Sequence, residues 1–386
     1  MKIVHIVEAL SIKGGGGDLS VAELAEQQAK IGHNVSIVYF KDLRKGDQEL
    51  NVRGVRKIGI PPSQIPIMRN LGFLYGLTEY FERELNSVDI VHIHGLWRWL
   101  LVAAASFCYK NNIPYISQPH GSLSRIQLKF KWIQKKIWWS LFDRKLVLRA
   151  SKVQAESGLD FVELTAAGIP RNKIYTAPCG IDFGAIAEAK NIMPNWGVSL
   201  KDNGFILFLA RLDVNKGLDL LIKALAQIPE EIQLPKIVIC GPDYHGTADK
   251  MKMLAREYQI DNKLVWTGII TKEKWWAYRN AALYILPSKS ENFGITVLEA
   301  MANRCPVLTT TATAWQEAGE LNCAIVVPPT VAGIKKGLLD FFRIREDERL
   351  SMTTRAYEYV ISRFDHAIVT QRILKEYEEI LAFSHS

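Results

Sequence analysis

The chain alternates short apolar runs with longer segments whose apolar residues recur at helical spacing. In the first half, the runs that predict β-strands are KIVHIV, NVSIVYF, DIVHIHG, PYISQPHG, KVQAES and KIYTAPCGI. In the second half they are FILFLARL, KIVIC, LVWTGII, ALYILPS, PVLTT and AIVVPP. Nearly continuous apolar strands separated by helices are typical of parallel sheets covered on both faces. The pattern therefore predicts an α/β protein with doubly wound parallel sheets.

A polar segment from about residue 183 to 204, which contains proline and glycine, interrupts this alternation. We interpret it as a domain connection and predict two Rossmann-like domains, one at 1–183 and one at 184–364. A C-terminal helix at about 365–386 is expected to pack back on the first domain. Ligands of open parallel sheets bind beyond the carboxyl ends of the strands. We therefore expect the two domains to face a cleft that holds a shared site.

The composition is that of an ordinary soluble globular protein. Of 386 residues, 48% are apolar and 23% are charged, a balance that excludes extensive disorder. Five scattered cysteines without metal-ligand spacing favour a reducing cytoplasm. The first apolar run is followed by glycines and reads as a buried strand rather than a signal peptide. No apolar run reaches the ~18 residues of a transmembrane helix.

Most of the net charge of +8 lies in one stretch, residues 125–149, which holds eight Lys or Arg and one Asp. Tryptophan and phenylalanine alternate with the lysines there. One interpretation is a helix that associates with anionic lipid, placing the protein peripherally on the inner face of the plasma membrane. The other is an amphipathic helix that packs on the first domain with a solvated basic face. No nucleic-acid-binding motif accompanies the charge, so nucleic acid is not an expected partner.

A glycine-rich loop, GGGGDLS at Gly14–Ser20, follows the first strand and precedes a helix. Backbone amides at such a position can bind an anion, because no Cβ atoms block the approach and the helix start adds positive potential. A dinucleotide fingerprint needs a third glycine where Leu19 stands, so the loop gives weak support to NAD binding. By itself it is as consistent with a flexible turn as with a phosphate cradle.

Cations and carboxylates follow two strands of the second half. ARLDVNKG places Arg211 and Lys216 after the first strand of the second half. The planar guanidinium of arginine and the compact charge of lysine both suit a diphosphate. SENFGITVLEAM places Glu291 before a glycine turn and Glu299 inside the helix predicted at 295–303. Carboxylates beside a diphosphate would repel it, so we expect them to accept hydrogen bonds from sugar hydroxyls. The pair fits a nucleotide-sugar with one carboxylate for each sugar ring.

The segment HIHG places His92 and His94 on one face of a predicted strand. No third ligand at metal spacing is evident, so a zinc site is not expected. His94 has two open interpretations, a contact to an acceptor or a histidine with its hydrogen bonds satisfied in the core.

Four motifs in this order resemble the retaining GT-B glycosyltransferases of family 4. They are the glycine loop, QPHGS at Gln118–Ser122, ARLDVNKG and SENFGITVLEAM. The resemblance covers essentially the whole chain. It implies a GT-B fold, with two Rossmann-like domains facing a cleft, and transfer of a sugar from a nucleotide-sugar.

The resemblance also implies roles for individual residues. Arg211 and Lys216 would stabilise the leaving diphosphate, and Glu299 would bind the ribose hydroxyls. Glu291 would hold hydroxyls of the transferred sugar, and His120 would lie near that sugar at the reacting face. Further contacts to the donor or acceptor are implied for Gly16, Gly17, Ile269, Phe293, Gly294 and Ile295.

Two features depart from the family pattern. Asn292 stands where many relatives carry glycine, and the loop has four glycines in place of two, which leaves open which glycine touches ligand. The resemblance implies a same-face reaction with retention, in which the leaving diphosphate oxygen helps to deprotonate the acceptor. No Asp-x-Asp occurs in the chain, so we expect neither a metal requirement nor a cofactor.

The donor expected from the resemblance is UDP-glucose, with GDP-mannose as the alternative. The expected acceptor is a glycan or a polyprenyl-linked sugar in polysaccharide biosynthesis. Two other classes remain as alternatives: a non-catalytic protein that binds nucleotide-sugar or glycan, and an NAD-dependent sugar-modifying enzyme.

Overall fold

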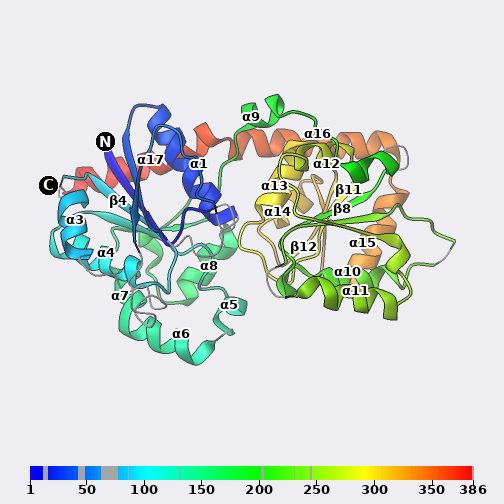
Figure 1. Cartoon of the computed structure of the whole chain (residues 1–386), viewed down its shortest axis with the longest axis horizontal. Helices are drawn as coiled ribbons and strands as arrows, with labels where there is room; N and C mark the ends of the chain where they lie inside the picture. Colours follow the sequence, from blue (N-terminus) through cyan, green and yellow to red (C-terminus); the bar gives the residue numbers. More distant parts are fainter. Residues whose placement is uncertain are drawn as a thin grey trace. The chain divides into compact units, whose positions relative to one another are not determined.

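The protein is described here by a computed structural model that covers residues 1–11, 16–41, 48–61, 77–85, 87–129, 131–200, 204–229, 231–243 and 246–384. The chain forms two compact units. Unit 1 comprises Met1–Gly180 and His366–Ser386, and unit 2 comprises Ile181–Asp365. Each unit holds one parallel sheet with helices around it (Figure 1). The predicted fold class, two doubly wound α/β domains, is confirmed.

Unit 1 is built on a seven-stranded sheet in the order β3-β2-β1-β4-β5-β6-β7. Its strands are β1 Lys2–Val7, β2 Asn34–Phe40, β3 Arg56–Ile60, β4 Ile90–His94, β5 Tyr115–Gln118, β6 Lys152–Ala155 and β7 Ile174–Thr176. The helices that cover it are α1 Gly16–Lys30, α3 Leu77–Leu85, α4 Trp99–Lys110, α7 Arg144–Arg149, α8 Gly158–Ala166 and α17 His366–Ser384. The chain order reverses between β1 and β4, which makes this the topological switch point of unit 1.

Successive residues of β1 are buried against opposite layers of unit 1. Val4 and Ile6 belong to the apolar cluster that includes residues of α3 and α4. Ile3 packs with residues of α17, and Val7 packs with residues of α1. In Figure 1, α1 and α17 accordingly lie on one side of the sheet, and α3 and α4 lie on the other. The apolar residues at four of its six positions, Ile3, Val4, Ile6 and Val7, follow from burial on both faces of the sheet.

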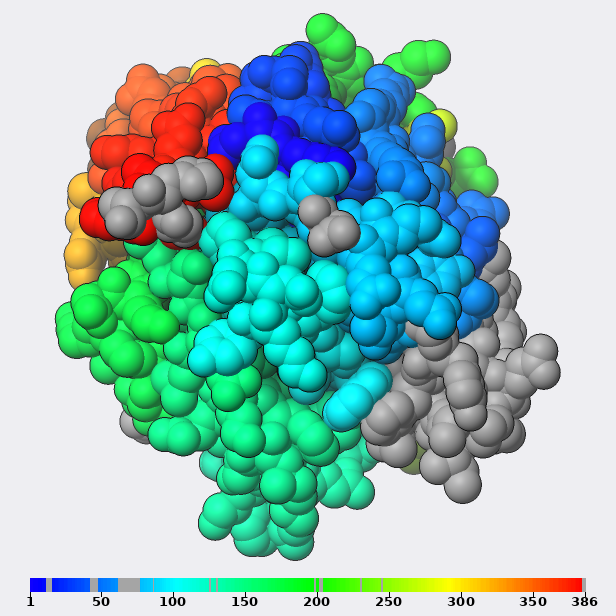
Figure 2. Space-filling view, turned by 90° about the vertical axis from the view of Figure 1, so that its left-hand side faces the viewer, coloured from blue at the N-terminus to red at the C-terminus, as the bar shows by residue number. Residues whose placement is uncertain are grey.

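The basic stretch forms a series of short helices: α5 Arg125–Lys129, α6 Trp132–Trp138, a π-helix at Trp139–Asp143, and α7. In Figure 2, the segment around α6 protrudes at the lower edge of the face shown. Asp143 anchors the π-helix from inside, because its buried carboxylate accepts a hydrogen bond of 2.8 Å from the backbone amide of Trp97. Among the residues that the structure describes, no helix is both long and apolar enough to cross a bilayer.

Unit 2 is built on a six-stranded sheet in the order β10-β9-β8-β11-β12-β13. Its strands are β8 Ile206–Leu209, β9 Ile237–Cys240, β10 Leu264–Gly268, β11 Leu283–Leu286, β12 Val307–Thr310 and β13 Ile325–Val327. Its helices are α9 Phe183–Glu188, α10 Leu218–Leu225, α11 Thr247–Glu257, α12 Lys274–Asn280, α13 Ile295–Ala302, α14 Gln316–Glu320, α15 Val331–Arg343 and α16 Glu346–Phe364. The order reverses between β8 and β11.

The polar segment that the sequence suggested as a domain connection is a packed part of unit 2. It contains α9 and a 3-10 turn at Asn195–Ser199. Within that turn, the ring of Trp196 contacts Phe205 edge-on at a centroid distance of 5.4 Å and Trp276 at 5.7 Å. The guanidinium of Arg279 also donates hydrogen bonds to the carbonyls of Ile186 and Ala189. Aromatic packing and these hydrogen bonds hold a segment whose polar composition suggested a linker.

Candidate functional site

The two loops with the predicted cations and carboxylates lie together at the switch point of unit 2. β8 and β11 are adjacent parallel strands, and residues 210–217 follow β8 while residues 287–294 follow β11. Parallel strands end at the same edge of the sheet, and ligands of such sheets bind outside the switch point. The topology of unit 2 thus joins two motifs that are far apart in the sequence.

Gly217 allows the two loops to approach closely. Its backbone is left-handed, with φ 72°, and a Cβ atom at this position would lie 1.9 Å from the carbonyl oxygen of Pro287. The backbone amide of Lys289 donates a hydrogen bond of 2.8 Å to the carbonyl of Asn215 across the same gap. A glycine is therefore required next to Lys216 both for its conformation and for the space it leaves.

Lys216 and Glu291 form an ion pair between the loops, from Nζ to Oε2. Their side chains are only 15% and 14% exposed. The amide of Glu291 donates a hydrogen bond of 3.0 Å to the carbonyl of Ala312, which fixes the loop from the side of β12. Two residues that the sequence assigned to neighbouring parts of one ligand therefore touch in the structure.

The start of α13 lies directly beside this pair. Gly294 caps the helix in a left-handed conformation, and a Cβ atom there would lie 3.1 Å from Cγ of Glu291. The buried Phe293 is held by its carbonyl, which accepts a hydrogen bond of 2.6 Å from Nε1 of Trp315. Ile295 is the first residue of the helix. The first turn of α13 thus presents backbone amides that suit an anion next to Lys216.

Glu299, the second predicted carboxylate, lies on the next turn of α13 and is only 6% exposed. Its two oxygens accept hydrogen bonds from Nζ of Lys274 at 2.6 Å and from the hydroxyl of Tyr278 at 2.9 Å. Burial, and then the negative charge of Glu299, raises the pKa of Tyr278 well above its usual value, so the phenol remains a donor. Lys274 was not predicted as a site residue, because no motif marks it and only the packing of α12 on α13 brings it to Glu299.

Arg211 and Ile269 are exposed, and the structure does not join them to the Lys216–Glu291 pair. Within the described part of the chain, Arg211 makes no ion pair. Ile269 follows β10 and is 64% exposed. Both lie beyond the carboxyl ends of strands of unit 2, as the sequence predicted for residues that meet a ligand.

The remaining predicted residues belong to unit 1. Gly16 and Gly17 are the first residues of α1, and both are exposed; Gly14 and Gly15 lie outside the described residues. His120 follows β5 and has a left-handed backbone with φ 52°, which is uncommon for a residue other than glycine. Its side chain is 19% exposed, and its Nδ1 lies 2.5 Å from Oε1 of Glu156, at the end of β6.

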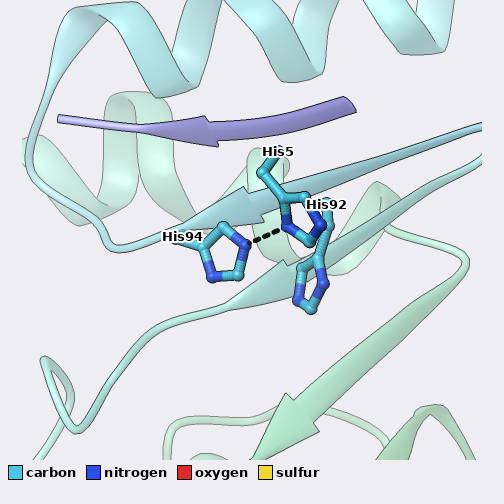
Figure 3. A group of neighbouring side chains, drawn as sticks. All are labelled: His5, His92 and His94. Atoms are coloured by element: carbon cyan, nitrogen blue, oxygen red, sulfur yellow. Dashed lines mark hydrogen bonds between the residues drawn. The ribbon is translucent and has the colours of Figure 1, made fainter. Parts of the chain in front are cut away.

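The sequence analysis found no third histidine to complement His92 and His94, and this was wrong. His5 of β1 is the direct cross-strand partner of His92, and all three imidazoles gather on one face of the sheet (Figure 3). One ring nitrogen of each lies within 4.8 Å of those of the others. The sequence offered one indication of this: His5 is the fourth residue of the run KIVHIV, as His92 is the fourth residue of DIVHIHG, and each follows an apolar Ile-Val pair.

Glu156 sets the pKa of His120 apart from the pKa values of the three clustered histidines. Desolvation lowers the pKa of His5 to about 4 and the pKa values of His92 and His94 well below their usual value. Burial alone would also lower the pKa of His120, but the charge and hydrogen bond of Glu156 raise it above its usual value. Burial would raise the pKa of Glu156, but the His120 imidazolium lowers it. Unit 1 thus holds a His120–Glu156 pair, in which the histidine pKa is raised and the carboxyl pKa is lowered, beside a buried cluster of histidines with lowered pKa values.

Two family models match the chain. The one described as Glycosyltransferase Family 4 matches residues 14–184, and the one described as Glycosyl transferases group 1 matches residues 193–359. Together they span both units and include every predicted site residue.

Curated relatives and solved structures agree with these matches. Mannosylfructose-phosphate synthase of Agrobacterium fabrum is 25% identical over 77% of this chain and 71% of that protein. GDP-mannose:cellobiosyl-diphosphopolyprenol alpha-mannosyltransferase of Komagataeibacter xylinus is 25% identical over 80% of this chain and 75% of that protein. The crystal structure of HepE from Anabaena, in complex with UDP and glucose, superposes with a TM-score of 0.78 at 18% identity and covers 98% of this chain and 100% of HepE. This last likeness concerns the fold.

Proposed function

The chain belongs to the GT-B glycosyltransferases of family 4, and from this premise we propose that it transfers a hexose from UDP-glucose, with retention, to a glycan or polyprenyl-linked acceptor in polysaccharide biosynthesis. Enzymes of this type act on nucleotide-sugars. The observation that carries the proposal for this chain is the Lys216–Glu291 pair beside the start of α13, at the switch point of unit 2.

In this proposal the diphosphate of the donor binds at Lys216, Arg211 and the first amides of α13. Glu299, presented by Lys274 and Tyr278, accepts hydrogen bonds from the ribose hydroxyls. Glu291 accepts hydrogen bonds from hydroxyls of the transferred hexose while Lys216 offsets its charge. Ile269 contacts the base, and Phe293, Gly294 and Ile295 contact the donor through their backbone. In unit 1, His120 lies near the transferred sugar at the reacting face. Gly16 and Gly17 contact the phosphates or the acceptor.

The reaction breaks the bond between the anomeric carbon and the diphosphate oxygen, and the negative charge that develops on that oxygen is stabilised by Lys216 and Arg211. The leaving oxygen takes the proton of the acceptor hydroxyl as the new glycosidic bond forms on the same face of the sugar. A double displacement needs a carboxylate nucleophile, and in this proposal Glu291 instead accepts hydrogen bonds from hydroxyls of the hexose. The proposal includes no metal ion and no cofactor, because these cations and amides meet the charge of the diphosphate.

GDP-mannose is the second candidate donor. It is favoured by the name of the Komagataeibacter xylinus relative, which is a GDP-mannose-dependent mannosyltransferase acting on a diphosphopolyprenol acceptor. The same relative supports a polyprenyl-linked acceptor for this chain.

A thermal-shift panel of UDP-, GDP- and ADP-sugars tests the proposed donor site. A ligand at 100 times its Kd stabilises the protein by about 2.7 kcal/mol, so the true donor should raise the melting temperature measurably. Arg211→Ala and Glu299→Ala should each reduce this shift, because one removes a diphosphate contact and the other a ribose contact. Arg345→Ala, on the surface of unit 2, is the matched control and should keep the full shift. If Arg211→Ala and Glu299→Ala both respond like the control, the site is misplaced.

We also propose that unit 1 associates with anionic membrane through a surface that we call the basic apolar face. Four exposed apolar side chains define it: Trp132, Ile133, Ile137 and Leu141, which are 54–59% exposed. The spacing of four residues places Ile133 and Ile137 along one face of α6, and Leu141 follows in the π-helix. The exposed cations around them are Lys129, Lys131, Lys136, Arg144 and Lys145. Apolar side chains that insert among lipid, flanked by cations that meet anionic headgroups, match a membrane surface.

Vesicle co-sedimentation tests the basic apolar face. The protein should bind vesicles that contain both phosphatidylcholine and phosphatidylglycerol. Binding should weaken when salt is added and when the vesicles contain phosphatidylcholine alone. The double variant Ile133→Glu/Ile137→Glu should bind at least roughly tenfold more weakly, because inserting two apolar side chains into the lipid contributes more than about 1.4 kcal/mol to the binding free energy. Val162→Glu, which changes an equally exposed apolar residue of α8, should bind as the unchanged protein does. Equal binding by the two variants would assign the basic apolar face to another role.

A further inference from the structure

A chain of four hydrogen bonds leads from α1 across β1 to residues at or just after the carboxyl ends of β4, β5 and β6 in unit 1. It runs from Oε1 of Gln28 to Nε2 of His5 at 2.7 Å, and from Nδ1 of His5 to Nε2 of His94 at 2.9 Å. It continues from Nδ1 of His94 to Nε2 of His120 at 3.1 Å, and from Nδ1 of His120 to Oε1 of Glu156 at 2.5 Å. Figure 3 shows the link between His5 and His94. We call these five residues the histidine chain.

The histidine chain needs one more proton than three neutral imidazoles carry. Each of the four hydrogen bonds contains one proton, and both ends of the chain, an amide oxygen and a carboxylate, are acceptors. A neutral imidazole supplies one N–H and one acceptor nitrogen. With Oε1 of Gln28 facing Nε2 of His5, three neutral rings leave one hydrogen bond without a proton, so this orientation of the amide requires four protons in the chain.

The positions of these protons follow from the Gln28 end. His5 donates from Nε2 to Gln28, so its Nδ1 accepts from Nε2–H of His94. His94 then accepts at Nδ1 from Nε2–H of His120. The fourth proton lies between Nδ1 of His120 and Glu156, whose Oε1 also accepts from Nε2 of Gln118 at 3.0 Å and from Sγ of Cys179 at 3.7 Å. Three donors on one oxygen stabilise a carboxylate, so this proton belongs to His120.

We propose that the histidine chain holds His120 as an imidazolium through neutral pH, with Glu156 and His94 as the positioning residues that occupy both of its ring nitrogens. His120 therefore does not serve as a general base, and it meets the sugar as a fixed positive charge. This last consequence rests on the proposed function, whereas the protonation of His120 does not.

The groups that face His120 come from each of the elements around it. Glu156 lies at the end of β6, Asp160 on α8, Asp18 on α1 and His94 on β4; Cys179 donates to Glu156 from the segment after β7. Burial, followed by the charge of Glu156, raises the pKa of Asp160 to about 7, and burial raises that of Asp18 to about 6. Neither carboxyl replaces Glu156, because Glu156 alone among them bonds His120 directly.

The pH dependence of this pair has a definite sign. The pKa of His120 is raised, so the stabilisation by the pair is fully present below the ordinary pKa of histidine and is lost as the pH rises through the raised value. The pKa of Glu156 is lowered, so acid breaks the pair only as the pH falls through that lowered value. Activity that depends on the His120 charge should therefore fall on the alkaline side.

The three clustered histidines could alternatively hold a metal ion, and the hydrogen bonds argue against it. Metal ligation needs ring nitrogens that are free of protons and directed at the ion. Nδ1 of His5 and Nε2 of His94 instead bond each other. A bound ion would break that hydrogen bond and leave fewer protons on the histidine chain. The metal-bound and metal-free chains therefore differ in the number of protonated ring nitrogens, which NMR observes.

Nitrogen-15 NMR of the histidine side chains, on the full chain at pH 7, tests the proposal. His120 should show two protonated ring nitrogens, and His5 and His94 should each show a single Nε2–H tautomer; His120→Asn assigns the His120 signals. In Glu156→Gln, the proton affinity of His120 should fall by at least about tenfold, which is one pKa unit. Glu379→Gln removes a carboxylate of unit 1 that pairs with Lys152, and this control should leave His120 unchanged.

A neutral His120 at pH 7, or no change in its titration in Glu156→Gln, would overturn the proposal. Stoichiometric binding of added Zn²⁺ that shifts the ring nitrogens of His5 and His94 would overturn it in favour of a metal site. Once a donor has been found by the sugar panel, the alkaline limb of kcat should move to lower pH in Glu156→Gln and stay in place in Glu379→Gln. The NMR result does not depend on that donor, so the failure of the proposed function and the failure of this inference are distinguishable.

Discussion

Lys216→Ala is expected to lower kcat by about 10²–10³-fold. Removing one preordered group that stabilises developing negative charge has this effect in other enzymes, and Lys216 is held in place by Glu291 with only 15% of its side chain exposed. The loss should fall mainly on kcat, because the charge on the diphosphate oxygen grows in the transition state. Initial rates with the donor found by the sugar panel, measured over a range of donor concentrations, give kcat and KM separately.

Lys57→Ala is the matched control for this measurement. Lys57 of β3 also forms an ion pair, with Glu49, and its side chain is 28% exposed, so the change removes a comparable pair from unit 1. It should leave kcat within about twofold, since a pair of this kind contributes about 1 kcal/mol or less to stability. An unchanged kcat in Lys216→Ala, or an equal loss in both variants, would show that Lys216 does not meet the leaving group.

Gly217→Ala is expected to destabilise unit 2 by roughly 3 kcal/mol. The left-handed backbone costs a residue with a Cβ atom about 1–2 kcal/mol, and overlap with a fixed neighbour adds about 1–3 kcal/mol. The neighbour is the carbonyl oxygen of Pro287, 1.9 Å from the added Cβ atom. Urea unfolding followed by tryptophan fluorescence measures the loss. Because the adjacent Lys216 moves with this loop, kcat should also fall.

Gly246→Ala separates the two causes. Gly246 has a similar left-handed conformation, with φ 66°, but a Cβ atom there meets nothing within 4 Å. It should therefore lose only the conformational part, about 1 kcal/mol. Equal losses at Gly217 and Gly246 would mean that the loop relaxes away from Pro287 and that the close approach of the two loops is not rigid.

The strands and the site loops of this protein could be predicted because they depend on local patterns. Short continuous apolar runs such as FILFLARL, bounded by turn residues and alternating with helical segments, favour strands buried on both faces of a sheet. All the predicted runs contain strands. Lys216 and Glu291 were predicted as site residues because both follow such runs, and parallel strands end at one edge. The packing of the polar segment around Trp196 could not be predicted, since its composition gives no sign that one ring packs on Phe205 and Trp276.

Side-chain contacts between different helices and strands could not be predicted from the sequence. Lys274 meets Glu299, and His5 meets His94, only because α12 packs on α13 and β1 lies beside β4. Glu156 gave no signal either, although its carboxylate decides the charge of His120. A residue type shows which bonds a side chain can make, but its partners depend on strand order, and strand order is a property of the assembled sheet.

The sequence by itself determined the fold class, the positions of the loops that carry charge, and the family to which the chain belongs. These follow from the periodicity of apolar residues and from motifs that are read locally. The tertiary structure alone decided which charges neutralise each other and which histidine carries a proton. Such decisions depend on distances of a few ångströms and on exclusion of water, and both arise only when separate elements of the chain are packed together.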